Sequence, residues 1–178
     1  MADIIMSGLG GQGVLTAGKI LINIAAAEGK NVSWTSTYGA AMRGGSASCN
    51  IVVSDEEIGS PYPSQYDILF AMSDEAYETY VGNMRDGGTV IINSSMVGEH
   101  DFPKNVNVYA VPATNEANEA GNSRAANLVM LGALIEATKL MDTQKFGAGL
   151  NAYFEKKGHN TPSNLVCYQK GVATVEKK

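Results

Sequence analysis

A glycine-rich string near the start of the chain has the residue types and spacing of a phosphate-binding loop. It lies between an apolar run at residues 4–6 and a helical pattern that begins at Val14. Glycine lacks a Cβ atom, so the backbone can turn tightly, and the peptide N–H groups at a helix start favour an anion. The string therefore predicts a phosphate or nucleotide site, with a purely structural tight turn as the alternative. It matches G-x-G-x-x-G and reads Gly8, Leu9, Gly10, Gly11, Gln12 and Gly13.

An ordinary NAD site is disfavoured, because the acid that would bind the ribose is missing. The dinucleotide-binding pattern expects Asp or Glu about 20 residues after the glycines, at the end of the second strand. No Asp or Glu occurs from Gly29 to Ser54, and the second strand candidate ends in Thr35-Ser36-Thr37. An NADP site stays formally possible, through Arg43 only.

A second loop, residues 38–45, is polar and rich in glycine, with Arg43 in its centre. Glycines around one arginine suggest a fixed backbone that presents the guanidinium group to an anion or a partner surface. Tyr38, Gly44 and Gly45 complete this candidate contact. The alternative is a solvated loop in which the arginine is incidental.

The cysteines and histidines are too few for a metal centre. The chain has Cys49 and Cys167, His100 and His159, and neither a CxxC nor an HExxH motif. An iron–sulfur cluster needs four cysteine ligands, and structural zinc needs a Cys/His quartet at short spacings. We therefore expect free buried thiols, solvated or capping histidines, no metal site and no catalytic residue.

The composition indicates one globular domain that spans residues 1–178. Hydrophobic residues make up 44% and charged residues 17%, and 13 Lys and Arg against 18 Asp and Glu give a net charge of −5. Nucleic-acid binding needs a cationic surface, so it is disfavoured. The N-terminus carries an acid where a signal peptide is basic, and no apolar run is long enough to span a membrane. We expect a soluble cytoplasmic protein.

Hydrophobic spacing predicts alternating strands and helices at first, and helices alone toward the end. Gly87-Gly88 is expected to separate a helix that starts at Ser73 from the strand that follows. The pattern favours a Rossmann-like three-layer α/β domain with a mostly parallel sheet and C-terminal helices. The predicted strands are 4–6, 31–35, 46–54, 68–72, 89–92 and 106–111, and the predicted helices are 14–28, 73–84, 125–141, 146–157 and 162–175.

Two asparagines stand out by position. Asn93 directly follows a predicted strand, so it is a candidate to line a ligand crevice at the carboxyl end of the sheet, with a turn or N-cap role as the alternative. Asn127 is a polar residue within an apolar helix, where its side chain would satisfy the backbone of a loop. We assign no chemistry to Asn127.

Several segments in order carry a family resemblance that covers more than half the chain. They are residues 8–18 (GLGGQGVLTAG), Trp34, residues 38–39 (YG), 42–47 (MRGGSA), 53–61 (VSDEEIGSP) and 87–95 (GGTVIINSS), with the 127–134 helix. The set resembles the gamma subunit of 2-oxoacid:ferredoxin oxidoreductases, of the 2-oxoglutarate or 2-ketoisovalerate type. One departure concerns Ala40-Ala41, where the family usually shows Pro-Glu; the chain thus lacks a rigid turn and a carboxylate there.

The resemblance implies a subunit without a catalytic centre of its own. Members of the family oxidatively decarboxylate a 2-oxoacid, pass electrons through iron–sulfur clusters to ferredoxin and transfer the acyl group to coenzyme A. Thiamine diphosphate with Mg²⁺ lies in the alpha and beta subunits, and the clusters lie in beta or a delta subunit. By this resemblance the glycine loop, with Thr16, would cradle a phosphate of coenzyme A, and Tyr38, Arg43, Gly44, Gly45 and Asn93 would face that coenzyme or the partner subunits.

Two other interpretations stay open at this point. A self-contained oxidoreductase or sensor would use the same glycine loop for NAD(P) or a flavin. A purely structural interaction subunit would use both loops only to hold an interface.

Overall fold

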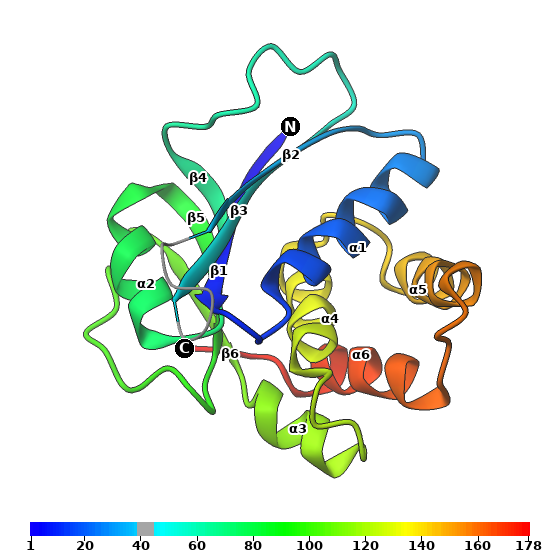
Figure 1. The fold of residues 1–178 in the computed structure, drawn as a ribbon. Helices are drawn as coiled ribbons and strands as arrows, with labels where there is room; N and C mark the ends of the chain where they lie inside the picture. Colours follow the sequence, from blue (N-terminus) through cyan, green and yellow to red (C-terminus); the bar gives the residue numbers. More distant parts are fainter. Residues whose placement is uncertain (39–44) are drawn as a thin grey trace.

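The computed structural model describes residues 1–38 and 45–178 (Figure 1). This part of the chain forms a seven-stranded sheet with helices on both faces. The strands are β1 (Ala2–Leu9), β2 (Asn31–Tyr38), β3 (Ser46–Ser54), β4 (Tyr66–Ala71), β5 (Met84–Asn93), β6 (Asn107–Val111) and β7 (Glu176–Lys177). The helices are α1 (Val14–Ala27), α2 (Asp74–Tyr80), the 3₁₀ turn η1 (Val81–Asn83), α3 (Ala113–Glu119), α4 (Ala126–Thr138), α5 (Thr143–Lys157) and α6 (Pro162–Thr174).

The sheet has the strand order β2-β3-β1-β4-β5-β6-β7. Strands β1, β4, β5 and β6 are parallel neighbours, whereas β3 and β7 are antiparallel to the strands beside them. Because β1 and β2 are both antiparallel to β3, they point the same way, so five of the seven strands share one direction. The predicted mostly parallel α/β sheet is confirmed.

One local expectation needs correction, because β2 does not pair with β1. β3 lies between them, in an unbroken antiparallel register with β1 from Ala2 opposite Val53 to Leu9 opposite Ser46. The physical reason lies in the side chains: β3 is buried at seven of its nine positions, which suits the interior of a sheet. The side chains of residues 31–37 on β2 are half-buried or exposed, as at a sheet edge.

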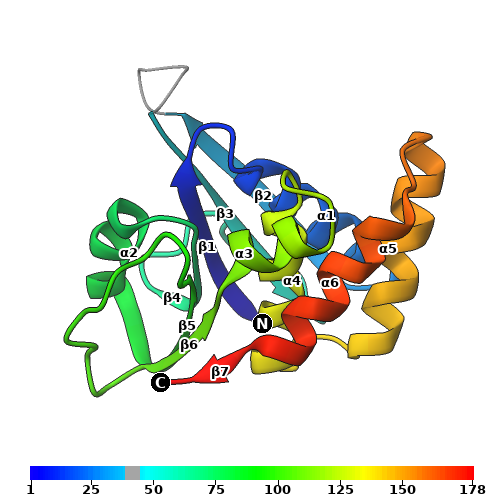
Figure 2. The ribbon, with the colours of Figure 1, turned by 90° about the horizontal axis from the view of Figure 1, so that it is seen from below.

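The helices form two layers, as predicted. α1, α3, α4, α5 and α6 lie on one side of the sheet, and α2 lies on the other (Figures 1 and 2). Successive residues of β1 point to opposite faces, so Ile4 and Met6 join the core beneath α1 and α4, while Ile5 joins the core beneath α2. Each face of the sheet therefore has its own hydrophobic core.

The segment after α2 differs from the sequence prediction. The helix ends at Tyr80 rather than near Met84, η1 follows, and β5 already begins at Met84. Gly87 and Gly88 therefore lie inside β5, beside a register shift in its pairing with β4. Gly87 has φ +80°, and a Cβ atom on Gly88 would lie 2.9 Å from the carbonyl oxygen of Arg85, so the strand bends where only glycine fits. Helix α3 and strand β7 were not predicted.

Helices α4 and α6 cross in direct backbone contact. A Cβ atom on Gly171 would lie 2.7 Å from the carbonyl carbon of Val129, and one on Gly132 would lie 3.0 Å from that of Tyr168. Two glycines, one on each helix, thus let the helix axes approach more closely than other residues would permit.

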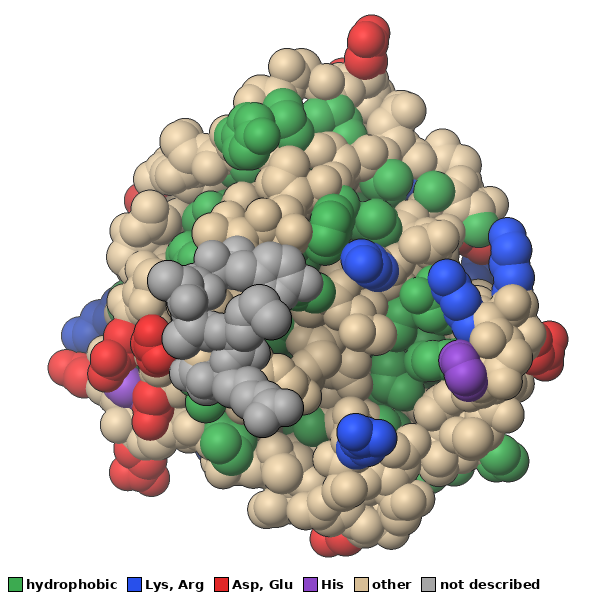
Figure 3. All heavy atoms as spheres, viewed as in Figure 1, with side chains coloured by type: hydrophobic (Ala, Val, Ile, Leu, Met, Phe, Trp, Pro, Cys, Tyr) green, Lys and Arg blue, Asp and Glu red, His purple; other side chains and the backbone are tan. Residues whose placement is uncertain are grey.

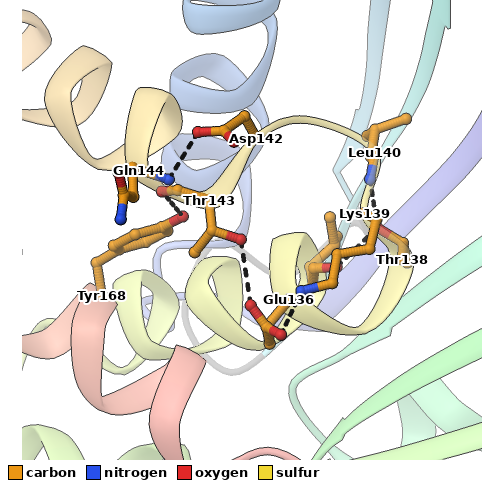
Figure 4. Close-up of polar contacts among 9 residues, drawn as sticks. Glu136, Thr138, Lys139, Leu140, Asp142, Thr143, Gln144 and Tyr168 are labelled. Atoms are coloured by element: carbon orange, nitrogen blue, oxygen red, sulfur yellow. Dashed lines mark hydrogen bonds and ion pairs between the residues drawn. The ribbon is translucent and has the colours of Figure 1, made fainter.

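Polar contacts fix α5 against this pair of helices (Figure 4). The Asp142 carboxylate caps α5 by accepting hydrogen bonds from the backbone N–H groups of Gln144 (3.0 Å) and Lys145 (2.8 Å). The Tyr168 hydroxyl donates to the Thr143 carbonyl oxygen (2.9 Å), which joins α6 to the start of α5. Burial raises the pKa of this tyrosine, so the hydroxyl stays a donor.

Candidate functional site

The glycine loop lies at the carboxyl end of β1, in the middle of the sheet, and leads directly into α1 (Figures 1 and 2). The neighbouring strand β4 leads into α2 on the opposite face. Chain connections therefore leave adjacent parallel strands toward opposite faces at this point. In open α/β sheets such a switch point is where ligands bind.

The Gln12 side chain holds the loop in shape. Its Oε1 atom accepts a hydrogen bond from the Leu9 backbone N–H (2.7 Å), and its Nε2 atom donates to the Met72 carbonyl oxygen at the end of β4 (3.1 Å). Gly8 is equally internal, since a Cβ atom there would lie 2.6 Å from the Met72 Cβ atom. Gln12 and Gly8 therefore hold the loop in shape through contacts with the chain itself.

The outer side of the loop is open. Gly10 and Gly11 are exposed, and Gly11 has φ +95°, where an added Cβ atom would meet nothing within 4 Å. α1 begins after Gly13 without a side-chain cap and has no acid in its first turn. Among the described residues, the N–H groups of Val14, Leu15 and Thr16 find no acceptor, whereas that of Ala17 donates to the Gly13 carbonyl oxygen (2.9 Å). With the exposed Thr16 hydroxyl beside them, these donors can bind an anion.

The second loop ends beside the first. The Gly10 N–H donates to the Gly45 carbonyl oxygen (2.8 Å), and Leu9 is paired with Ser46 at the start of β3. Arg43 and Gly44 lie outside the described residues, and Tyr38 is described only as the last residue of β2. Gly45 is thus a backbone contact of the glycine loop.

Asn127 reaches the loop from α4. Its Nδ2 atom donates to the Gly13 carbonyl oxygen (3.1 Å), and the side chain is buried. Gly13 has φ +75°, and a Cβ atom there would lie 2.7 Å from Asn127 Nδ2. The expected role in satisfying a loop backbone is confirmed.

Arg124 is a residue that sequence reasoning missed. It is exposed and lies three positions before Asn127, at the start of α4, so the Asn127 contact places it at the same end of the sheet as the glycine loop. α4 also starts without a side-chain cap or an acid in its first turn. In Figure 3, acidic side chains gather over α2, while basic side chains lie on the side of α1 and α4. The electrostatic field beside α1 and α4 therefore suits an anion.

Asn93 is not at a surface. Its side chain is fully buried, and its Nδ2 atom donates to Thr114 Oγ1 (3.0 Å). Its Oδ1 atom accepts from the Ser95 backbone N–H (3.2 Å). Asn93 therefore joins the end of β5 to α3, which supports the turn role rather than a ligand or partner contact.

One small cavity borders the loop. It measures about 30 Å³, is bordered by Ser7, Gly8, Ser46 and Ser73, and has room for one or two water molecules. A cofactor needs several hundred Å³, so this cavity is not a cofactor pocket. Moreover, β3 separates the end of β2 from the glycine loop, so no β2 residue occupies the position of a ribose-binding acid.

The cysteines and His100 have structural surroundings. Cys49 and Cys167 are free and buried, and burial raises the pKa of the Cys49 thiol to about 12. His100 Nε2 lies 2.8 Å from Asp74 Oδ1, and the hydrogen bond lowers the pKa of that carboxyl group. Within residues 1–38 and 45–178, no three His, Cys, Asp or Glu side chains come together as metal ligands would. None of the helices in this part is long and apolar enough to cross a membrane.

Comparison with known proteins gives close sequence relatives. The family model for pyruvate ferredoxin/flavodoxin oxidoreductase matches residues 3–174. The chain is 39% identical to 2-oxoglutarate synthase subunit KorC of Methanothermobacter marburgensis over 80% of each chain. It is 36% identical to ketoisovalerate oxidoreductase subunit VorA of the same organism, over 93% of this chain and 35% of that one.

Solved structures share the fold. A 2-oxoglutarate:ferredoxin oxidoreductase from Magnetococcus marinus, with 2-oxoglutarate, coenzyme A and succinyl-CoA bound, gives a TM-score of 0.84 at 27% identity over 97% of this chain and 31% of that one. The gamma subunit of a keto/oxoacid ferredoxin oxidoreductase from Geobacter sulfurreducens gives 0.76 at 26% identity, over 98% of this chain and 100% of that one. The chain thus spans about a third of VorA and of the Magnetococcus chain, and all of the Geobacter subunit. It belongs to the pyruvate ferredoxin/flavodoxin oxidoreductase family, in which it corresponds to the gamma subunit.

Proposed function

We propose that this chain is the gamma subunit of a thiamine-diphosphate-dependent 2-oxoacid:ferredoxin oxidoreductase, and that its glycine loop helps to bind coenzyme A. The enzyme would decarboxylate a 2-oxoacid oxidatively, pass the electrons to ferredoxin and form the acyl-CoA thioester. The names of the relatives support the reaction class, and the coenzyme A in the Magnetococcus structure supports the ligand. The observation that carries the ligand proposal is the open, uncapped start of α1 at the switch point of the sheet.

The redox chemistry would belong to the partner chains. Two buried cysteines are too few for an iron–sulfur cluster, so the clusters, like thiamine diphosphate and Mg²⁺, would lie in the alpha and beta subunits or in a delta subunit. Free buried thiols also fit a reducing compartment such as the cytoplasm. The gamma subunit would then act by closing the site and by binding substrate.

Coenzyme A carries phosphates that the described residues can bind. The N–H groups of the first turn of α1 would donate to phosphate oxygens, and the Thr16 hydroxyl would add another donor. Arg124 would supply the positive charge at the start of α4. The cavity of about 30 Å³ beside the loop is too small for the rest of the coenzyme, which a partner subunit would cover.

The test uses the complex assembled from this chain with its alpha and beta partners. Calorimetric titration compares coenzyme A with pantetheine, which lacks the phosphates. We expect the wild-type complex to prefer coenzyme A, and the variant Arg124→Ala to weaken coenzyme A binding by about tenfold, as loss of a charge-assisted contact predicts. Lys104→Ala removes an exposed cation elsewhere and is the matched control.

Two outcomes separate the parts of this proposal. Equal affinity of the wild-type and variant complexes for coenzyme A would leave the gamma subunit as a structural interaction partner and remove the ligand role. Failure of the chain to form any complex with the alpha and beta subunits would overturn the gamma-subunit assignment itself.

A further inference from the structure

The two edges of the sheet are built differently. β7 has only two residues, Glu176 and Lys177, and both are charged. β2 has eight residues, with no charge and no proline, and its register with β3 runs unbroken from Asn31 opposite Ser54 to Tyr38 opposite Ala47. No strand of the described chain pairs with the outer side of β2.

Short length, charge, proline and bulges are the usual means by which proteins prevent a sheet edge from pairing with another strand. β7 uses the first two of them, whereas β2 uses none. An edge strand offers a row of backbone N–H and C=O groups that only another strand can satisfy in full. Within residues 1–38 and 45–178, the outer backbone groups of β2 have no strand to pair with. The isolated chain thus leaves β2 incomplete.

We propose that β2 pairs with the β2 strand of a second copy of this chain, antiparallel about a twofold axis, to form one continuous sheet across the dimer. A twofold interface brings the same surface together twice, so it must be complementary to itself. An uncharged strand meets this condition because no like charges face each other. A strand with charges of one sign would instead favour a different, oppositely charged chain.

Charge also selects the register. Lys19 Nζ lies 5.4 Å from the centre of the Trp34 ring, on the α1 face of the sheet. If Trp34 were on the twofold axis, the two Lys19 side chains would meet across it. With Thr35 on the axis, Trp34 lies opposite Ser36 and Ser33 lies opposite Thr37, so the two lysines separate and hydroxyl groups face each other. At the Asn31 end, Lys30 is compensated by its ion pair with Asp55 (2.5 Å).

The size of the interface predicts its strength. One pair of eight-residue strands buries less than the roughly 1,200 Å² of a standard stable interface, so the dimer should dissociate on dilution in the micromolar range. Sedimentation or light scattering on the purified chain should show a mass that rises with concentration from 18.7 kDa toward twice that value.

Thr35→Lys places two like charges at the axis and should raise the dissociation constant at least about tenfold. Glu176→Lys, a charge change on the other edge strand, is the matched control and should leave the dimer unchanged. Thermal melting checks that each variant folds. An equimolar mixture of Thr35→Lys and Thr35→Glu should regain the dimer, because opposite charges then face each other. An unfolded variant would not be rescued in this way.

Disulfide trapping gives an independent measurement. Cys49 and Cys167 are buried, whereas Thr37 is exposed on β2, so a mixture of Ser33→Cys and Thr37→Cys chains places two thiols opposite each other if the axis is at Thr35. We expect rapid disulfide dimers from this mixture and none from Ser123→Cys, which lies on an exposed loop. A wild-type chain that stays monomeric from micromolar to millimolar concentration would overturn the proposal, as would a dimer that Thr35→Lys does not weaken. A strand from a different chain found on β2 in the assembled complex would overturn it as well.

Discussion

The substitution Gly171→Ala tests how closely α4 and α6 must approach. The added Cβ atom would overlap the Val129 carbonyl oxygen and would lie 2.7 Å from the carbonyl carbon of the same residue. Ordinary contact begins near 3.4 Å, so the carbon alone requires the helices to part by 0.7 Å (3.4 − 2.7), and the nearer oxygen requires more. Overpacking of a core costs about 1–3 kcal/mol, and a clash between two backbones lies at the top of that range. Alanine recovers about 1 kcal/mol of helix propensity, which leaves a net loss of roughly 2 kcal/mol.

For a chain of this size, 1 kcal/mol shifts the melting temperature by about 2–4 °C, so Gly171→Ala should melt about 4–8 °C below the wild type. Circular dichroism measures the melting curve, and urea denaturation gives the free energy of unfolding. Gly59→Ala is the matched control, because a Cβ atom there meets nothing within 4 Å. If Gly171→Ala melts with the control, the close crossing of α4 and α6 is not a constraint on the fold, and the reasoning fails.

Three further changes test other contacts. Arg85→Met leaves the buried Asp3 carboxylate without the guanidinium group that lies 2.6 Å away, and should cost roughly 2 kcal/mol in urea denaturation; a loss near zero would contradict this. The His100 hydrogen bond lowers the pKa of Asp74, so its stabilisation is present above the ordinary carboxyl pKa near 3.8 and is lost as pH falls through the lower folded value. As the pH is lowered from 5 into the acid range, the melting temperature of Asp74→Asn should therefore fall less than that of the wild type. Melting temperatures that fall in parallel for the two proteins would refute the stabilising role of the Asp74 carboxylate. Burial raises the pKa of Cys49 to about 12, so a thiol reagent at neutral pH should label this residue only in denaturant; modification of the native chain would contradict its burial.

The first strand, loop and helix could be predicted from the sequence because the forces that shape them are local. Four glycines in six residues mark a tight turn, and the apolar spacing from Val14 marks a helix that the structure ends at Ala27. Gly29, with φ +83°, ends the helix as expected of a C-terminal glycine. The glycine loop was therefore placed correctly between a strand and a helix.

The order of the strands could not be read in the same way, because it depends on contacts between distant segments. Residues 31–35 look like the second strand of a parallel unit, but β3 is more deeply buried on both faces and takes the place beside β1. Likewise, Gly87 and Gly88 look like a separator in sequence. Their role becomes clear only where β5 bends beside β4.

The candidate site shows the same limit at the level of single side chains. The G-x-G-x-x-G pattern treats its residues alike, but the structure divides them: Gln12 and Gly8 contact the chain itself, while Gly11 faces outward. Asn127 is 114 positions away from Gly13, so its contact depends on how α4 packs. A polar residue in an apolar helix was the signal in the sequence, and it identified the residue without identifying its partner.

This division bears on how a ligand role can be separated from a structural one. Substitutions at Gly8, Gln12 or Asn127 would loosen the loop itself, so a loss of coenzyme A binding in such variants would say nothing about direct contact. Arg124 is exposed, and among the described residues no side-chain contact depends on it. A fall in coenzyme A binding on Arg124→Ala without a fall in melting temperature would therefore point to direct contact at the outer surface. Gly11 cannot serve in the same way, because its φ of +95° makes any larger residue strain the loop.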